Sequence, residues 1–313
     1  MRGKNSYTPH DVFAKEVLSV RANAIDFFRG VLPEQIAEQA DLSSLTEDKT
    51  SYTDERLSEY FSDLVFTCSY RGKPLKLVLL FEHKSFVPRF PFYQLLRYFS
   101  NIWYQQMKDK EPLSVVLPII LYHGRRRWKK RALSTYLSGN IDGFKRFIPE
   151  FDYLLVDLSE FSHEEIKSKL FHRTAVQLWL LVQKYVFDLP KLKNNLKKIF
   201  RLGILYFSEE EGLRFLESLL RYVIFTTDIP VETIMDSVEV LPTEAKERAM
   251  TTAERLIEKG REEGLQKGIS TGARKNCLEN ARKMMEEGLD VSLIVRVTGL
   301  TEEELRELQA EQK

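Results

Sequence analysis

Two acidic residues and a lysine lie at the open end of one predicted β-hairpin, in a stretch that is otherwise apolar. Asp63 begins the first strand, and Glu82, near the end of the second, is followed two residues later by Lys84. Carboxylate oxygens, carbonyl oxygens and water are the ligands that Mg²⁺ prefers. A metal held there would polarise a phosphodiester, and a nearby ammonium group would stabilise the charge that develops on the phosphate. These residue types predict a metal-assisted hydrolytic site.

The turn of the hairpin decides whether the two acids meet. A two-residue loop at Gly72-Lys73 suits a type II′ turn, because glycine tolerates a positive φ at the first position. This loop places Asp63 directly opposite Glu82, where Cβ atoms are about 5 Å apart. Two carboxylates at that distance repel each other unless a cation lies between them. We expect Asp63 and Glu82 to bind the metal and Lys84 to assist the attack; the alternative is a surface ion pair between Glu82 and Lys84.

The elements that must position these residues follow from the hydrophobic pattern. Residues 11–32 and 92–107 have apolar side chains at helical spacing, whereas 34–55 are polar and irregular, with a short strand near 50–53. Residues 113–124 form a continuous apolar run of strand length, and 153–158 repeat that pattern more weakly. The fold class predicted is α/β, with a mixed central sheet flanked by helices.

At the acidic residues the sequence resembles the PD-(D/E)XK nuclease superfamily. Asp63 and the run Glu82-His83-Lys84 match its core motif, although Ser62 stands where the motif has proline. Gln94 and Tyr98 on the following helix resemble the Q-x-x-x-Y element of some members. The resemblance implies a restriction-endonuclease-like core, in which Gln94 and Tyr98 orient the nucleophile or the DNA strand.

Five ordered motifs are more specific. The segments HDVFAKEVL, EYFSDLVF, LLFEHKS, FYQLLRY and PIILYHG resemble the recombination-promoting nuclease family, also known as a transposase family, over roughly residues 9–240. This resemblance implies a divalent-metal-dependent DNA endonuclease linked to recombination, mobile elements or phage defence. The implied cofactor is Mg²⁺, or Mn²⁺ or Ca²⁺ in its place, and the implied partner is DNA.

The resemblance also implies an acid on the first helix as a further metal ligand. Asp11 and Glu16 are the candidates, and Asp11, in His10-Asp11, fits the family pattern better. An acid in the first turn of a helix is also favoured by the helix dipole. Two interpretations therefore fit Asp11, a metal ligand and a helix-stabilising acid.

A dense basic segment follows the longer apolar strand. Its six cations surround Trp128 and are Arg125, Arg126, Arg127, Lys129, Lys130 and Arg131. Such a loop would neutralise DNA phosphates, and the tryptophan could stack on an unpaired base. The alternative is a solvated loop with Trp128 packed inward. His123, just before the loop, contacts DNA or caps the strand, whereas His83 is expected to be a packed histidine.

Changes in residue composition and hydrophobic pattern divide the chain into three parts. These are a nuclease core (residues 1–160), a helical extension (161–245) and a glycine-repeat linker with a C-terminal helical module (246–313). The linker glycines recur every four residues, at Gly260, Gly264, Gly268 and Gly272. A glycine in a helix costs about 1 kcal/mol relative to alanine. The repeat therefore indicates either close helix–helix approach or a segment that is not firmly helical.

The end of the chain reads as two short helices separated by Gly299, and Thr301 with Glu304 forms a capping-box pattern. The second helix carries four glutamates and only Arg306 as a cation, so that DNA phosphates would repel it. We therefore expect a helix–helix interaction module, a route to homo-oligomers, rather than a DNA-binding helix-turn-helix.

Composition sets the remaining expectations. The 313 residues include only two cysteines, Cys68 and Cys277, and no apolar run approaches the roughly 20 residues of a membrane span. This predicts a cytoplasmic protein without a membrane segment. A catalytically inactive nucleic-acid- or protein-binding module is the competing hypothesis. A full transposase is disfavoured because no clear third carboxylate of the D-D-E type lies on a separate element.

Overall fold

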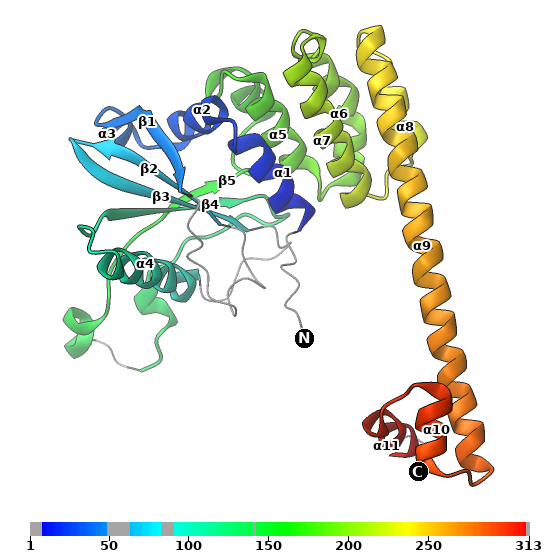
Figure 1. Cartoon of the computed structure of the whole chain (residues 1–313). Coiled ribbons are helices and arrows are strands. Elements are labelled where there is room, and N and C mark those ends of the chain that lie inside the picture. Colours follow the sequence, from blue (N-terminus) through cyan, green and yellow to red (C-terminus); the bar gives the residue numbers. More distant parts are fainter. Residues whose placement is uncertain (1–7, 49–62, 83–90, 140–141, 311–313) are drawn as a thin grey trace. The chain divides into compact units, whose positions relative to one another are not determined.

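The computed structural model describes residues 8–48, 63–82, 91–139 and 142–310, and for Asp63, Phe81, Glu82 and Ala310 it describes the backbone alone. The chain forms two compact units, Met1–Thr252 and Ala253–Lys313. Figure 1 shows that the first unit contains a central sheet together with helices, whereas the second unit consists of helices. Across the described ranges, no helix combines the length and apolar character that a membrane span needs.

Within the described ranges, five strands form one mixed sheet in the order β1-β2-β3-β4-β5. The strands are β1 (Ala40–Asp48), β2 (Asp63–Tyr70), β3 (Lys73–Glu82), β4 (Val115–Tyr122) and β5 (Leu154–Asp157). The first three pair antiparallel, and β3, β4 and β5 run parallel. With helices on both sides, this is the predicted α/β class, consistent with a restriction-endonuclease-like core.

The predicted hairpin turn is wrong by one residue. The loop between β2 and β3 is Arg71-Gly72, and both residues have positive φ, 50° and 75°, as a type I′ turn requires. A left-handed conformation is costly for arginine. It is offset here because the main-chain nitrogen of Arg71 donates to the carbonyl of Gln39 and its side chain donates to the Gln39 amide oxygen.

Residues 34–55 are more regular than expected. They contain the short helix α3 (Glu34–Ala37) and the whole of β1, which pairs with β2. Alternate residues Ala40 and Leu42, with Leu45 beyond an irregularity, are buried, whereas the other face is largely polar. An edge strand with one solvated face is too polar to be recognised as a strand. The strand expected near residues 50–53 lies outside the described residues.

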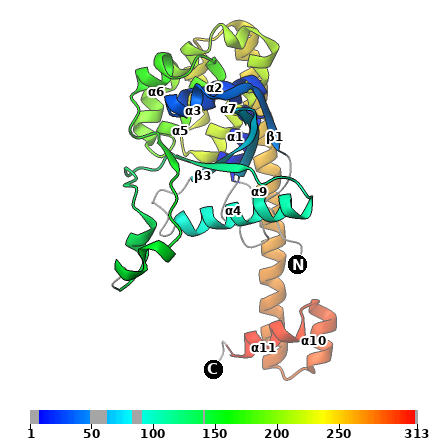
Figure 2. The same cartoon turned by 90° about the vertical axis from the view of Figure 1, so that its left-hand side faces the viewer.

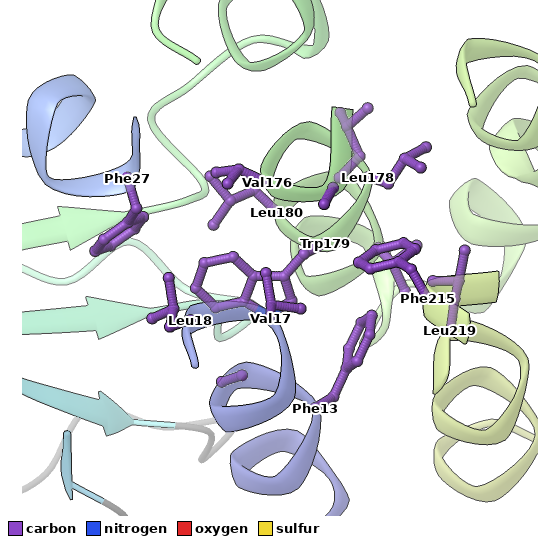
Figure 3. Packing of buried hydrophobic residues seen from close by; sticks show 14 of the residues in the cluster. Phe13, Val17, Leu18, Phe27, Val176, Leu178, Trp179, Leu180, Phe215 and Leu219 are labelled. Carbon is purple, nitrogen blue, oxygen red and sulfur yellow. The ribbon is translucent and has the colours of Figure 1, made fainter. Parts of the chain in front are cut away.

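Helices cover both faces of the sheet (Figure 2). On one face lie α1 (Pro9–Leu18), α2 (Arg21–Val31), α5 (Thr174–Tyr185) and α7 (Glu210–Thr226), whose apolar side chains join Leu64, Phe66, Leu77 and Leu79 of the hairpin. Figure 3 shows Phe13, Val17 and Leu18 of α1 beside Trp179 of α5. The first unit also contains α6 (Leu189–Leu202), α8 (Val231–Val238) and the first part of α9.

The opposite face packs against α4 (Pro91–Lys108), the helix predicted at residues 92–107. Val65, Val78 and Leu80 of the hairpin pack there with Leu95 and Tyr98. Odd positions of β2 and even positions of β3 therefore share this face, as the two-residue period of a strand requires. The turn error of one residue moves the register by two positions and leaves the alternation unchanged.

A buried carboxylate joins α2 to the start of α5. Asp26 is 5% exposed, and its two oxygens accept hydrogen bonds from the main-chain nitrogens of His172 and Arg173 at 2.9–3.1 Å. These nitrogens precede α5, which has no side-chain cap of its own. A carboxylate from a distant helix therefore satisfies nitrogens that the helix start leaves unpaired.

The second unit contains most of α9 (Thr243–Glu286), α10 (Val291–Thr298) and α11 (Glu302–Ala310). Its core includes Ala281, Ile294 and Leu305. The predicted capping box is confirmed, because the main-chain nitrogen of Thr301 donates to the Glu304 carboxylate at 2.8 Å and the Glu304 nitrogen donates to the Thr301 hydroxyl at 3.2 Å.

The linker glycines lie inside α9, so the expectation of a segment that is not firmly helical is wrong. The alternative of a close helix approach is not seen within the described residues either, since a Cβ added at Gly260, Gly264, Gly268 or Gly272 would meet no atom there within 4 Å. Packing within the described part of the chain therefore does not explain their spacing.

Candidate functional site at the carboxyl ends of the parallel strands

The parallel strands end level with one another at one edge of the sheet. Glu82 ends β3 and is the register partner of Tyr122, which ends β4 and is in turn the partner of Asp157 at the end of β5. Because β2 runs antiparallel to β3, its first residue, Asp63, lies at the same edge. Ligands of α/β sheets commonly bind at the carboxyl ends of strands. The backbone therefore gathers both predicted acids at the expected edge.

Asp63 does not lie opposite Glu82, as the sequence predicted. Its partner is Leu80, and Glu82 is two residues further along β3. The cause is the type I′ turn at Arg71-Gly72, which shifts the pairing. Diagonal neighbours of this kind lie about 7–8 Å apart, compared with about 5 Å for direct partners.

The donor set suits a hard divalent cation, because Asp63 and Glu82 both offer carboxylate oxygens and their backbones lie at one edge. Among the side chains that the structure describes, no group of three or more His, Cys, Asp and Glu residues could hold a metal. Lys84 and His83 lie outside the described residues, as do the side chains of Asp63 and Glu82.

Gln94 and Tyr98 lie one turn apart on α4, on the same side of that helix. The Tyr98 ring is fully buried in the cluster that contains Val65, Val78 and Leu80. Gln94 is half-buried, nearer the surface. Of the two side chains, Gln94 is therefore the more accessible to solvent, whereas Tyr98 packs α4 against the hairpin.

Asp11 forms a helix cap. It is 3% exposed, and its Oδ2 atom accepts hydrogen bonds from the main-chain nitrogen and the hydroxyl of Thr8, at 3.0 and 2.8 Å. Thr8 in turn accepts from the Asp11 nitrogen, which completes a capping box at the start of α1. These contacts fit the helix-stabilising interpretation of Asp11, and its role as a metal ligand stays a prediction. Glu16 forms an ion pair with Arg221 at 2.9 Å.

A buried polar chain connects α1 with α5 and α7. The Tyr222 hydroxyl donates to the Gln183 amide oxygen at 3.0 Å and lies 2.6 Å from Nδ1 of His10. Since the hydroxyl proton is used towards Gln183, Nδ1 of His10 is the donor in the second contact. Burial raises the pKa of Tyr222 well above its ordinary value, and the Asp11 carboxylate adds to this effect. The tyrosine is a neutral structural link.

His123 is a packed residue. It is 4% exposed, and its ring stacks on Phe187 with centroids 5.1 Å apart and lies 5.0 Å from the His10 ring. Packing among these rings accounts for the burial of His123, and its contact with DNA stays a prediction. His123 also lines a pocket of about 690 Å³, together with Lys184 and the start of α6. Burial lowers the pKa of Lys184, whose Nζ donates to the Leu158 carbonyl at 2.7 Å.

The basic loop leaves the same edge of the sheet, directly after β4. Its six cations are all exposed. Trp128 is 3% exposed and contacts the Tyr122 ring edge-to-face, with centroids 5.2 Å apart. The expectation that this tryptophan could stack on a base is wrong, because Tyr122 and its neighbours hold the indole in the core. The inward-packed alternative is confirmed for Trp128.

Three of the loop cations have partners in the chain. Arg125 donates to the Phe187 carbonyl at 2.8 Å, Arg127 pairs with Glu160 at 2.5 Å, and Lys130 pairs with Asp152 at 2.5 Å. The other three form no ion pair or side-chain hydrogen bond with the part of the chain that the structure describes; they are Arg126, Lys129 and Arg131. These cations are available to a polyanion.

Asp157 is a residue that the sequence analysis missed. It is 1% exposed, and its carboxylate accepts from the main-chain nitrogens of Trp128 and Ser159, at 2.8 and 2.9 Å. It therefore fixes the middle of the basic loop. An acid at the end of an apolar strand was the signal that could have revealed it, because a buried carboxylate needs nearby donors.

Residues 8–212 match the family model described as "Putative transposase, YhgA-like". The chain is 26% identical to the "Inactive recombination-promoting nuclease-like protein RpnE" of Escherichia coli strain K12, across 97% of this chain and 99% of that protein. It is 27% identical to "Recombination-promoting nuclease RpnA" of the same strain, across 97% and 98%. No solved structure matches the chain.

Residues 274–310 match a second family model, "Rpn/YhgA-like nuclease family, C-terminal HTH domain". The C-terminal helices thus have the helix-turn-helix class that the acidic second helix had argued against. Their charges are unusual for that class. The single cation of α11, Arg306, pairs with Glu302 at 3.2 Å. The class is therefore established by similarity, whereas the partner of the module is a separate question.

Proposed function

Because the chain belongs to the YhgA-like transposase family, with the C-terminal domain of the Rpn/YhgA-like nucleases, we propose that it is a divalent-metal-dependent endonuclease that hydrolyses DNA phosphodiesters. The names of its relatives connect this activity to recombination. The observation that carries the proposal is that Glu82, Tyr122 and Asp157 are register partners on neighbouring strands. This register places Glu82 and the start of the basic loop at the same edge of the sheet.

In this proposal Asp63 and Glu82 hold Mg²⁺, or Mn²⁺ or Ca²⁺ in its place, through their carboxylates. When bound, the cation supplies Lewis acidity to the phosphate and lowers the pKa of the attacking water. Lys84 orients that water or stabilises the charge on the phosphate oxygens. From its place on α4, Gln94 positions the DNA strand. Asp11 serves the site indirectly, by fixing the start of α1, rather than as a metal ligand.

The cations of the basic loop hold the DNA backbone. Arg126, Lys129 and Arg131 are the strongest candidates, because Arg125, Arg127 and Lys130 are already engaged within the chain. Contacts of this kind neutralise phosphates and position the duplex without reading its sequence. Asp157 keeps the loop at the edge of the sheet through its bond to Trp128.

The test is nicking of supercoiled plasmid by the purified full chain, in Mg²⁺, Mn²⁺, Ca²⁺ or EDTA. We expect metal-dependent nicking that disappears in Glu82→Gln, because the amide loses the charge that attracts the cation. Glu111→Gln, an exposed acid beyond α4, is the matched control and should nick like the wild type. Persistent nicking by Glu82→Gln would contradict the proposed metal site.

A second candidate is a binding module without activity, which is favoured by one observation: a relative that matches over nearly its full length is named inactive. Such a protein would shift DNA equally in EDTA and Mg²⁺ and would not nick it. Equal binding with no nicking, in wild type and Glu82→Gln alike, would establish this candidate instead.

For the C-terminal helix-turn-helix domain we propose association with a second copy of the chain rather than with DNA, because α11 is acidic. Sedimentation equilibrium of the full chain and of a chain ending at residue 286 tests this. The full chain should form an oligomer with more subunits than the shortened chain. An equal number of subunits for both chains would refute the proposal.

A further inference from the structure

Two phenylalanines are exposed on a short segment beside the basic loop. Phe144 and Phe147 are 64% and 66% exposed, within the 3₁₀ helix η2 (Asp142–Phe147). All six residues of η2 are exposed. Single exposed apolar residues are common, but two large rings on one fully exposed turn are better explained by a binding partner.

Aromatic residues on either side of the segment pack against α4. Tyr136, before it, and Phe151, after it, both contact the Phe92 ring, at centroid distances of 6.1 and 5.2 Å. Phe151 also contacts Phe99 at 4.9 Å. In Figure 2 the segment projects beyond one end of α4. The flanking residues Tyr136 and Phe151 therefore contact α4, whereas the phenylalanines between them are exposed to solvent.

Cations accompany the rings. The Arg146 guanidinium lies 4.8 Å from the centre of the Phe147 ring. A pocket of about 750 Å³ adjoins the segment, and its lining contains Lys145 together with Lys130 and Arg131 of the basic loop. The pocket therefore joins the basic loop to the aromatic segment in one continuous surface.

The acids of this surface are largely neutralised. Asp142 pairs with Lys145 at 2.8 Å and Asp152 pairs with Lys130 at 2.5 Å, and Glu150 is the remaining acid of the pocket lining. Arg131 and Arg146 form no ion pair with any residue that the structure describes. A surface with net positive charge and exposed rings suits a polyanion that itself offers flat aromatic faces.

We propose that Phe144 and Phe147 stack on the bases of an unpaired DNA strand whose phosphates follow the pocket towards Arg131. This inference rests on the proposed function, since it names the form of DNA that the site receives. In a duplex the base faces are covered by neighbouring bases, whereas a single strand leaves them open to aromatic side chains. Every base has such a face, so the contact tolerates any sequence.

The experiment measures binding without cleavage. Full-length protein carrying Glu82→Gln is titrated in EDTA against a single-stranded oligonucleotide containing 2-aminopurine and against the matching duplex. We expect Phe144→Ala and Phe147→Ala each to weaken single-strand binding about 5-fold or more, with little change for the duplex. The 2-aminopurine quenching on binding should also be reduced. Tyr104→Ala, at an exposed ring on α4 (65% exposed), is the matched control and should bind like its parent.

Phe147→Trp and Phe147→Leu distinguish stacking from general apolar contact. Tryptophan should retain single-strand binding, whereas leucine should lose it. Unchanged affinity in the alanine variants, or equal losses for single strand and duplex, would overturn the inference. A change in oligomeric state without a change in binding would also overturn it and assign the rings to a protein contact. Since no readout requires nicking, the inference and the proposed activity fail independently.

Discussion

The carboxylate of Asp157 accepts a hydrogen bond of 2.8 Å from the main-chain nitrogen of Trp128. One buried side chain at the end of β5 thus holds the middle of a loop that carries six cations. Its second oxygen accepts from the main-chain nitrogen of Ser159 at 2.9 Å, so each carboxylate oxygen has a main-chain donor. The position of the basic loop depends on this carboxylate.

We therefore expect Asp157→Ala to lower the free energy of unfolding by about 2–5 kcal/mol, because two buried nitrogens lose a charged acceptor. Asp157→Asn should cost less, since the amide oxygen can still accept one of the bonds. Urea unfolding measures both. Asp152→Ala, which removes an exposed ion pair with Lys130, is the control and should change stability by no more than about 1 kcal/mol. Equal losses at the two positions would contradict this account.

Asp26 should be equally sensitive, for a related reason. Its carboxylate accepts from the main-chain nitrogens of His172 and Arg173, which precede α5. Removal in Asp26→Ala should cost about 2–4 kcal/mol, because these nitrogens become unpaired. Thermal unfolding followed by circular dichroism measures the loss. Asp236→Ala, at an exposed acid on α8, should be nearly neutral, and a neutral Asp26→Ala would show that α5 does not need the cap.

The cations without partners in the described structure make a prediction about salt. If each binds one phosphate, Arg126→Ala and Arg131→Ala should each weaken DNA binding equally for all sequences and lower the slope of log K against log salt by about 1. Fluorescence anisotropy over a series of salt concentrations gives the slope. Lys193→Ala, an exposed cation on α6, should leave it unchanged. A slope that falls as much for the control would assign the effect to net charge.

The C-terminal domain should lose stability in acid. The main-chain hydrogen bond from Thr301 lowers the pKa of Glu304, and the Arg274 side chain contributes further. A lowered folded pKa means that the stabilisation is complete above the ordinary glutamate pKa of about 4.3 and disappears as the pH falls through the lower value. Hydrogen-exchange protection factors of residues 302–308 should therefore fall as the pH is lowered from 6 to 3.5.

In Glu304→Gln the same protection should be weaker at pH 6 and fall less steeply in acid, because the titrating group is gone. Glu279→Gln, at an exposed position on α9, should keep the wild-type pH profile. A profile that is identical in wild type and Glu304→Gln would assign the acid sensitivity to other residues.

Replacing a linker glycine by alanine should change the stability of α9, and the sign of that change is informative. Because no described atom lies near their missing Cβ positions, Gly264→Ala and Gly268→Ala should each stabilise α9 by about 1 kcal/mol. The reverse change, Ala273→Gly, should destabilise the helix by a similar amount. Hydrogen exchange along α9 measures all three. Destabilisation by Gly264→Ala would instead indicate a close contact with another helix.

The features that the sequence determined alone are those with local causes. The alternation of side chains along β2 and β3 follows from the two-residue period of a strand, so placing the turn one residue too late leaves it unchanged. The capping box at Thr301 depends on residues three positions apart, and it is present. The helix α4 was likewise evident from its apolar periodicity.

Contacts between distant residues decided the rest. Arg71 takes a left-handed turn because Gln39, 32 residues earlier, binds it, and this moves Asp63 away from Glu82. The start of α5 is capped by Asp26, 146 residues before His172. Trp128 turns inward because Tyr122 and Asp157 hold it, whereas Phe144 and Phe147 remain outside. Burial depends on which elements meet in space, and no local period in the sequence encodes that meeting.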